Sequence, residues 1–167
     1  MLAGSKGILF FQSYNEQFSK HKIKDIANVI NSISAVGKTI REGDVGGMSF
    51  TTSAKDVMIE VVRSPEQLLL VLVNIHATGY SNLLCHTGIT DRHWTFHPLK
   101  VESVELSLSS APDVTGLSNW REATGGKLLP LDSVKVEDKS GSVKLSDIEM
   151  SDDVPVRFFL ADVKSTY

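Results

Sequence analysis

Cysteine is almost absent from this chain of 167 residues, which contains one, Cys85. A single cysteine excludes an internal disulfide framework and the usual cysteine-rich zinc sites. The longest fully apolar segment, Leu68 to Val73, is far shorter than the roughly 20 residues that a helix needs to span a bilayer. Met1 to Gly7 lacks a basic segment followed by an apolar one, so we expect no N-terminal signal here.

The chain also lacks a strong excess of charge of either sign. Its net charge is -3 and its pI is near 5.9, which is no electrostatic footprint for nucleic acid. No run of basic residues is present that would attract the chain to anionic membranes. We therefore expect neither a nucleic-acid partner nor a membrane partner. The compartment is not determined, because a large secreted domain can fold without disulfides.

Two apolar segments rich in β-branched residues stand out in what is present. Val57–Arg63 and Leu68–Asn74 flank a short polar turn that contains Pro65, which predicts a β-hairpin. The second segment is apolar at every position before Asn74, so both faces of that strand should be buried. The hairpin is therefore expected inside a two-layer sandwich or beneath a helix.

The N-terminal part of the chain has a different periodicity. Gly7–Tyr14 is a short apolar segment that predicts a buried strand. From Asn15 to about Val36, apolar side chains recur at helical spacing, and Gly37 follows where a helix would end. The apolar stripe comprises Phe18, Ile23, Ile26, Ala27, Ile30 and Ile33. Such a stripe must be buried, so we expect the helix to dock across a sheet or to form a homo-oligomer.

After Gly47 the pattern changes to strands and turns without further helices. This spacing predicts a mainly β fold, an antiparallel β-sandwich preceded by one short strand and one amphipathic helix. The corresponding domains are residues 1–43 and residues 44–167. Besides the hairpin, the predicted strands are Ser49–Thr52, Trp94–His97, Val101–Leu108, Ser133–Glu137, Ser142–Leu145 and Val156–Ala161.

This order of elements resembles the C-terminal end of a (β/α)8-barrel glycoside hydrolase. Lys6–Ser13 resembles the last barrel strand, Ile23–Gly37 the last barrel helix, and Gly37–Gly43 the exit into an accessory sandwich. The hairpin is similar to the opening of that sandwich, and Val156–Asp162 to its closing strand. The catalytic carboxylates of such barrels lie on earlier strands, so the resemblance assigns no catalytic residue here.

The resemblance implies a non-catalytic accessory β-sandwich of a carbohydrate-active enzyme. Its partner would be polysaccharide or the parent catalytic barrel, it would need no cofactor, and a secreted parent would place it outside the cell. Two alternatives stay open. One is a free-standing enzyme, related to glycosidases or built on a histidine-bound metal. The other is a structural or protein-interaction module.

Candidate saccharide-binding residues are grouped around the two tryptophans. A sugar ring stacks its C–H face on a flat aromatic side chain, while neighbouring polar side chains bind its hydroxyls. Trp120 is favoured over Trp94 because Ser118 and Gly125–Gly126 place it in a polar, turn-rich stretch. The alternative is that either tryptophan packs in the core. The complete candidate set is Trp120, Trp94, Arg121, Asn119, Asp91 and Tyr80.

The densest group of metal-ligand residue types runs from Cys85 to His97, with His76 upstream. On one strand His93 and His97 would lie about 13 Å apart, too far to share one ion. Adjacent strand residues point to opposite faces, so Cys85 and His86 are poorly placed as a nucleophile–base pair. We therefore predict no metal site and a buried structural cysteine.

Overall fold

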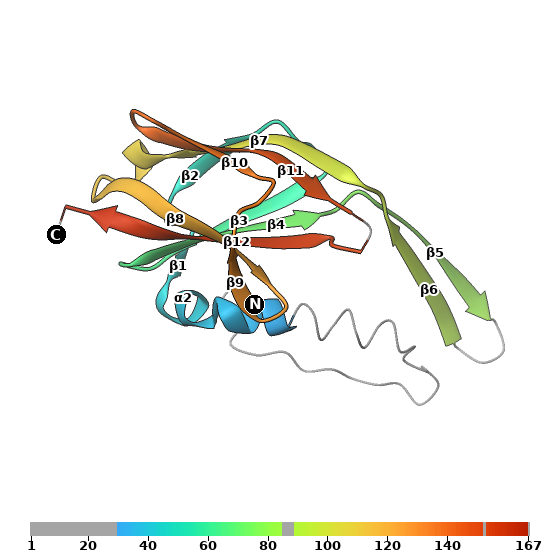
Figure 1. Ribbon diagram of the computed structural model, residues 1–167. Helices are drawn as coiled ribbons and strands as arrows, with labels where there is room; N and C mark the ends of the chain where they lie inside the picture. The colour runs from blue at the N-terminus through green and yellow to red at the C-terminus, as the bar shows by residue number, and fades with distance from the viewer. Residues whose placement is uncertain (1–29, 85–88, 152, 167) are drawn as a thin grey trace.

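The computed structural model describes residues 30–84, 89–151 and 153–166, and for residues 79–84 and 89–96 it describes the backbone alone. Two antiparallel β-sheets lie face to face, and a helical segment covers the outer face of one of them (Figure 1). The predicted mainly β fold is therefore confirmed. The predicted strand Gly7–Tyr14 and the predicted helix before residue 30 lie outside the described residues.

The larger sheet, called sheet A here, has six strands in the order β1-β3-β4-β12-β8-β9. The hairpin predicted from Val57 to Asn74 is confirmed, with Val57 paired to Asn74 and Arg63 to Leu68. The strands of sheet A are β1 (Asp44–Val45), β3 (Val57–Arg63), β4 (Gln67–Asn74), β8 (Val114–Thr124), β9 (Lys127–Pro130) and β12 (Val156–Ser165).

The smaller sheet, sheet B, has four strands in the order β10-β11-β7-β2. They are β2 (Ser49–Thr52), β7 (Leu99–Ser107), β10 (Lys135–Lys139) and β11 (Ser142–Met150). A short 3-10 helix, η1 (Leu108–Ser110), follows β7 on the way to sheet A. A separate two-stranded ribbon, β5 (Ala77–Leu84) and β6 (Ile89–Phe96), extends from one end of the sandwich (Figure 1).

Strand β4 is buried on both faces, as its sequence predicted. Leu68, Leu70 and Leu72 face the main core between the two sheets and are fully buried. Leu69 and Val71 face the opposite side and belong to a second core beneath the helical segment. Sheet B thus covers one face of β4 and the helical segment covers the other, so that both faces are buried.

The helical segment that covers sheet A is kinked. Residues 30–35 are helical, Val36 forms a turn, and α2 (Gly37–Glu42) continues beyond it. Val36 N–H bonds the carbonyl of Ile33 three residues earlier, and the Val36 carbonyl accepts from Ile40 N–H at 3.1 Å. This arrangement keeps Ile33, Val36 and Ile40 on the second core.

The predicted helix end at Gly37 is therefore wrong, because Gly37 begins α2. Gly43 ends the helical segment instead, donating its N–H to the Thr39 carbonyl at 2.9 Å. A Cβ atom at Gly43 would lie 2.6 Å from that carbonyl oxygen and 2.7 Å from a Val62 methyl group. A residue without a side chain is needed here for the helix to approach β3 this closely.

Four strands were missed by the sequence pattern: β1, β5, β8 and β9. Strand β1 has two residues, and each of the other three contains glycine, serine, threonine or proline at positions that are typical of turns. Strand β8 also contains an irregularity that disrupts its alternation, and it is described below. The predicted strands that lie within the described residues are present, several of them longer than expected, such as β6, β11 and β12.

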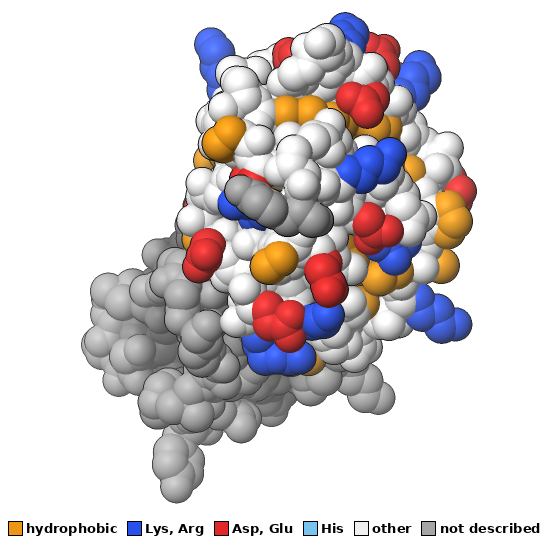
Figure 2. Space-filling model, turned by 90° about the vertical axis from the view of Figure 1, so that its left-hand side faces the viewer, with side chains coloured by type: hydrophobic (Ala, Val, Ile, Leu, Met, Phe, Trp, Pro, Cys, Tyr) orange, Lys and Arg blue, Asp and Glu red, His pale blue; other side chains and the backbone are white. Residues whose placement is uncertain are grey.

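Acidic and basic side chains are interspersed on the end of the molecule that lies to the left in Figure 1, and hydrophobic ones are scattered among them (Figure 2). No single sign of charge dominates this face, in keeping with the small net charge. In the described part of the chain, no helix has both the length and the apolar character needed to cross a bilayer.

Candidate functional site

Strand β8 carries half of the predicted saccharide-binding residues at a β-bulge. Its pairing with β12 shifts between Leu160, which faces Arg121, and Asp162, which faces Ser118. Asn119 and Trp120 therefore occupy the space opposite Ala161 alone, which is the arrangement of a bulge. Asn119 adopts a left-handed backbone with φ of 52°. A bulge changes the direction of the side chains on either side of it, and here it determines which residues of β8 face the core.

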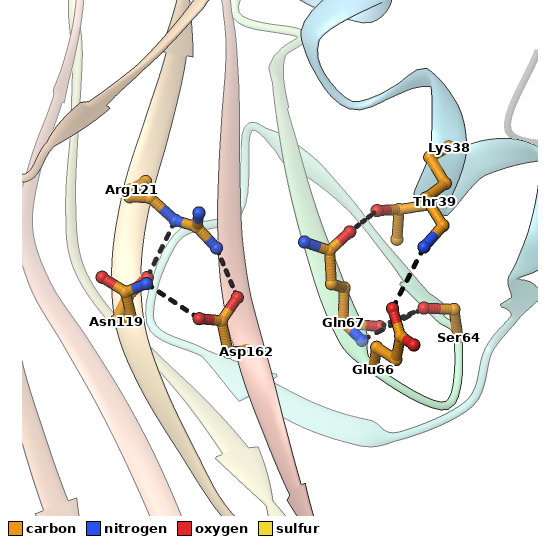
Figure 3. A network of polar contacts seen from close by, with 8 residues as sticks. All are labelled: Lys38, Thr39, Ser64, Glu66, Gln67, Asn119, Arg121 and Asp162. Carbon is orange, nitrogen blue, oxygen red and sulfur yellow. Dashed lines mark hydrogen bonds and ion pairs between the residues drawn. The ribbon is translucent and has the colours of Figure 1, made fainter.

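The bulge brings together three polar side chains on the helix-covered face of sheet A (Figure 3). Asn119 Nδ2 donates to Asp162 Oδ2 at 2.8 Å, and an Arg121 Nη2–Asp162 Oδ1 ion pair lies beside it. Arg121 Nε also donates to the Asn119 carbonyl at 3.1 Å. An amide, a guanidinium and a half-exposed carboxylate thus form a compact hydrogen-bonding group of the kind that binds sugar hydroxyls.

Contacts between α2 and the β3–β4 turn lie next to this polar group. Gln67 pairs with Asp162 across β4 and β12, and Thr39 Oγ1 donates to Gln67 Oε1 at 2.7 Å. Lys38 Nζ donates to Glu66 Oε2 at 3.1 Å, a hydrogen bond that raises the pKa of Lys38 (Figure 3). These contacts hold α2 on the sheet.

Trp120 does not share a surface with Asn119 and Arg121. Its side chain is half-buried and packs against the main core between the sheets, on the other face of sheet A from Arg121. Among the described residues, its Nε1–H is buried without a hydrogen-bond partner. Trp120 and the polar side chains expected beside it therefore lie on opposite faces of sheet A. The prediction grouped them because it interpreted this part of strand β8 as a turn-rich stretch.

The other three candidates lie on the projecting ribbon. Tyr80 is in β5, and Asp91 and Trp94 are in β6. The backbone register pairs Gly79 with Trp94 and Asn82 with Asp91. The ribbon lies far from the middle of β8, so the six candidates form two separate groups (Figure 1).

The base of the ribbon is held by Asn74, which is fully buried at the end of β4. Asn74 Nδ2 donates to the His97 carbonyl, and its Oδ1 accepts from His76 N–H, both at 2.8 Å. The rings of His76 and His97 are in contact, with centroids 4.9 Å apart. Thr78 Oγ1 lies 3.0 Å from His97 Nε2.

An ion pair between the buried Arg157 and the partly buried Glu122 was missed in the sequence. Arg157 forms a two-pronged contact with the Glu122 carboxylate, and its Nη1 donates to the Glu149 carbonyl on sheet B at 2.9 Å. The guanidinium also lies 5.0 Å from the Phe159 ring centroid. The sequence feature that could have indicated this contact is an arginine immediately before two phenylalanines in the closing strand. The pair links both sheets and is a structural contact.

The geometry defines a class: a mainly β, sandwich-like protein with a helix-covered sheet and a projecting ribbon. Within the described residues, no group of three or more histidine, cysteine, aspartate or glutamate side chains is placed to hold a metal ion. Cys85 and His86 lie outside those residues. Comparison of the sequence with protein-family models and with curated proteins finds no match.

Proposed function

We propose that this chain is a non-catalytic accessory domain of a carbohydrate-active enzyme and that it binds polysaccharide. The observation that supports it is the shared core between the helical segment and sheet A. Ile33, Val36 and Ile40 pack on Leu69, Val71 and Leu160. The helix that leads into the sandwich is thereby fixed to it, as expected where a barrel helix continues directly into an accessory sandwich.

We place the polysaccharide contact on the ribbon β5–β6. Because the Trp120 indole packs against the main core, Trp94 is the tryptophan left for stacking on a sugar ring. Tyr80 and Asp91 lie on the same ribbon, and they add a second aromatic side chain and a carboxylate for sugar hydroxyls. A projecting ribbon can lie along an extended chain of sugar units. The amide and guanidinium groups at the β8 bulge form a separate, second contact.

The affinity of such a site should be modest. Desolvation of hydroxyls offsets much of what stacking and hydrogen bonding contribute. Retention on insoluble polysaccharide and affinity electrophoresis in soluble polysaccharide detect weak binding of this kind. A panel of β-glucans, xylan, mannan, chitin and agarose covers the common chemistries of extended glycans.

The test compares Trp94→Ala with Trp120→Ala in the full chain. Trp94→Ala should abolish retention and leave the melting temperature nearly unchanged. Trp120→Ala should lower the free energy of unfolding by up to about 3 kcal/mol, because it truncates an aromatic side chain packed on the core. Below its melting temperature, Trp120→Ala should still be retained.

Thr95→Ala, next to Trp94 on the same strand, is the matched control and should bind like the unmodified chain. Retention that survives Trp94→Ala and is lost only in Trp120→Ala would contradict the placement on the ribbon. Absence of retention on every polysaccharide of the panel would contradict polysaccharide binding and favour a protein-interaction module.

A further inference from the structure

His76 and His97 form a cross-strand pair at the base of the ribbon. His97 N–H donates to the His76 carbonyl at 2.8 Å, so the two residues are direct neighbours across the strands. Their rings are 4.9 Å apart between centroids and inclined by 48°. The pair was not apparent in the sequence, where 20 residues separate the two histidines, because only the register of β5 and β6 brings them together.

The backbone of this pair is held in place from below. The fully buried Asn74 side chain bonds His76 N–H through its oxygen and the His97 carbonyl through its nitrogen. One amide therefore fixes both histidine backbones at once, and with them the positions from which the two rings project. The His76 side chain is exposed and that of His97 is half-exposed, so an ion in solution can reach both.

We propose that His76 and His97 bind one divalent transition-metal ion of the class that prefers imidazole: Cu²⁺, Ni²⁺ or Zn²⁺. With metal–nitrogen bonds of about 2.0 Å, each imidazole centroid lies roughly 3.2 Å from the ion. Two such rings at adjacent coordination positions have centroids about 4.5–5.2 Å apart, given that bond length. The observed separation of 4.9 Å falls within that range.

The rest of the coordination shell is open. Among the described residues, no third histidine, cysteine, aspartate or glutamate joins the pair. The Thr78 hydroxyl lies 3.0 Å from His97 Nε2, a spacing that suits an oxygen and a nitrogen at adjacent positions on one ion. Water would take the remaining positions. A bound ion would link the residue that precedes β5 to the residue that follows β6, and so hold the ribbon at its base.

The test is a titration of the metal-free full chain with Cu²⁺, Ni²⁺ and Zn²⁺ by isothermal calorimetry, with electron paramagnetic resonance of the Cu²⁺ form. We expect one ion per chain, tightest for Cu²⁺, and a spectrum with two nitrogen ligands. His76→Asn and His97→Asn should each weaken Cu²⁺ binding at least tenfold. His21→Asn, which removes a histidine elsewhere in the sequence, is the control and should leave the affinity unchanged.

Circular dichroism of each variant shows whether it folds, and a folded variant is required for the comparison. Equal weakening by all three substitutions would mean dispersed surface binding and would overturn the proposal. So would a single ion retained with full affinity in both His76→Asn and His97→Asn. Polysaccharide retention is measured separately, so failure of the metal site leaves the proposed function untouched.

Discussion

At the scale of single residues, the informative positions are those where a polar side chain stabilises an unusual backbone. Among the described residues, Asn119 and Asp147 are the two non-glycine residues with positive φ, 52° and 60°. Both are of the residue types that best tolerate this region. Asn119 is bound to Asp162, and Asp147 contacts Lys100 at 3.3 Å and Lys135 at 2.8 Å.

Replacing Asn119 separates the backbone effect from the side-chain effect. Asn119→Gly and Asn119→Ala both remove the amide contact with Asp162, but only alanine adds the strain of a left-handed backbone. Asn119→Ala should therefore be less stable than Asn119→Gly by about 1 kcal/mol. Urea denaturation followed by tryptophan fluorescence measures the difference. Equal stability of the two variants would show that the bulge relaxes to another conformation.

The way in which the free energy of unfolding falls at acidic pH should depend on Asp113. A hydrogen bond from Arg63 Nη1, 2.7 Å from Asp113 Oδ2, lowers the pKa of this carboxyl. The unfolded chain therefore binds a proton at Asp113 more tightly than the folded chain does. The stabilisation of the fold by the Arg63–Asp113 contact is fully present above the unfolded pKa of about 4. It is lost as the pH falls through the lower pKa of the folded state.

Asp113→Asn should accordingly lower the urea midpoint at pH 7, and its difference from the unmodified chain should shrink toward pH 3. The effect should be small, because both side chains are partly exposed. Asp132→Asn, an exposed carboxyl between β9 and β10, is the comparison. A deficit of Asp113→Asn that grows as the pH falls would contradict the assigned pKa direction.

At the scale of elements, the sequence predicted those whose periodicity is undisturbed. The β3–β4 hairpin is present as expected. Strand β8 was missed because the bulge at Asn119 breaks its alternation and Gly116 weakens its pattern. Strand β5 was missed because threonine, glycine and serine fill much of a ribbon that no second sheet covers in the described structure.

The two-sided burial of β4 can be tested with neighbouring leucines. Leu69 lies beneath the helical segment, and Leu70 lies in the main core; both are fully buried. Leu69→Ala and Leu70→Ala should each cost about 2–5 kcal/mol of unfolding free energy. Met58→Ala, on the exposed part of the helix-covered face, should cost much less, since Met58 is 51% exposed. A Leu69→Ala cost no greater than that of Met58→Ala would mean that the helix does not cover this face in solution.

At the scale of the whole molecule, the candidate site was less predictable than the fold. The candidate residues were chosen as neighbours in sequence, yet alternation along β8 puts Trp120 and Arg121 on opposite faces of sheet A. Conversely, Arg121 meets Asp162, and His76 meets His97, only through pairing between strands. Such contacts depend on register and on a bulge, neither of which a pattern of residue types determines.

The most direct test of the proposed polysaccharide binding is amide hydrogen exchange of the full chain, read by mass spectrometry with and without a soluble oligosaccharide of the retained polysaccharide. We predict slower exchange in peptides covering 77–84 and 89–96, with the core strands β3 and β4 unchanged. Unchanged exchange along the ribbon at saturating oligosaccharide, or protection confined to other segments, would contradict the proposed site.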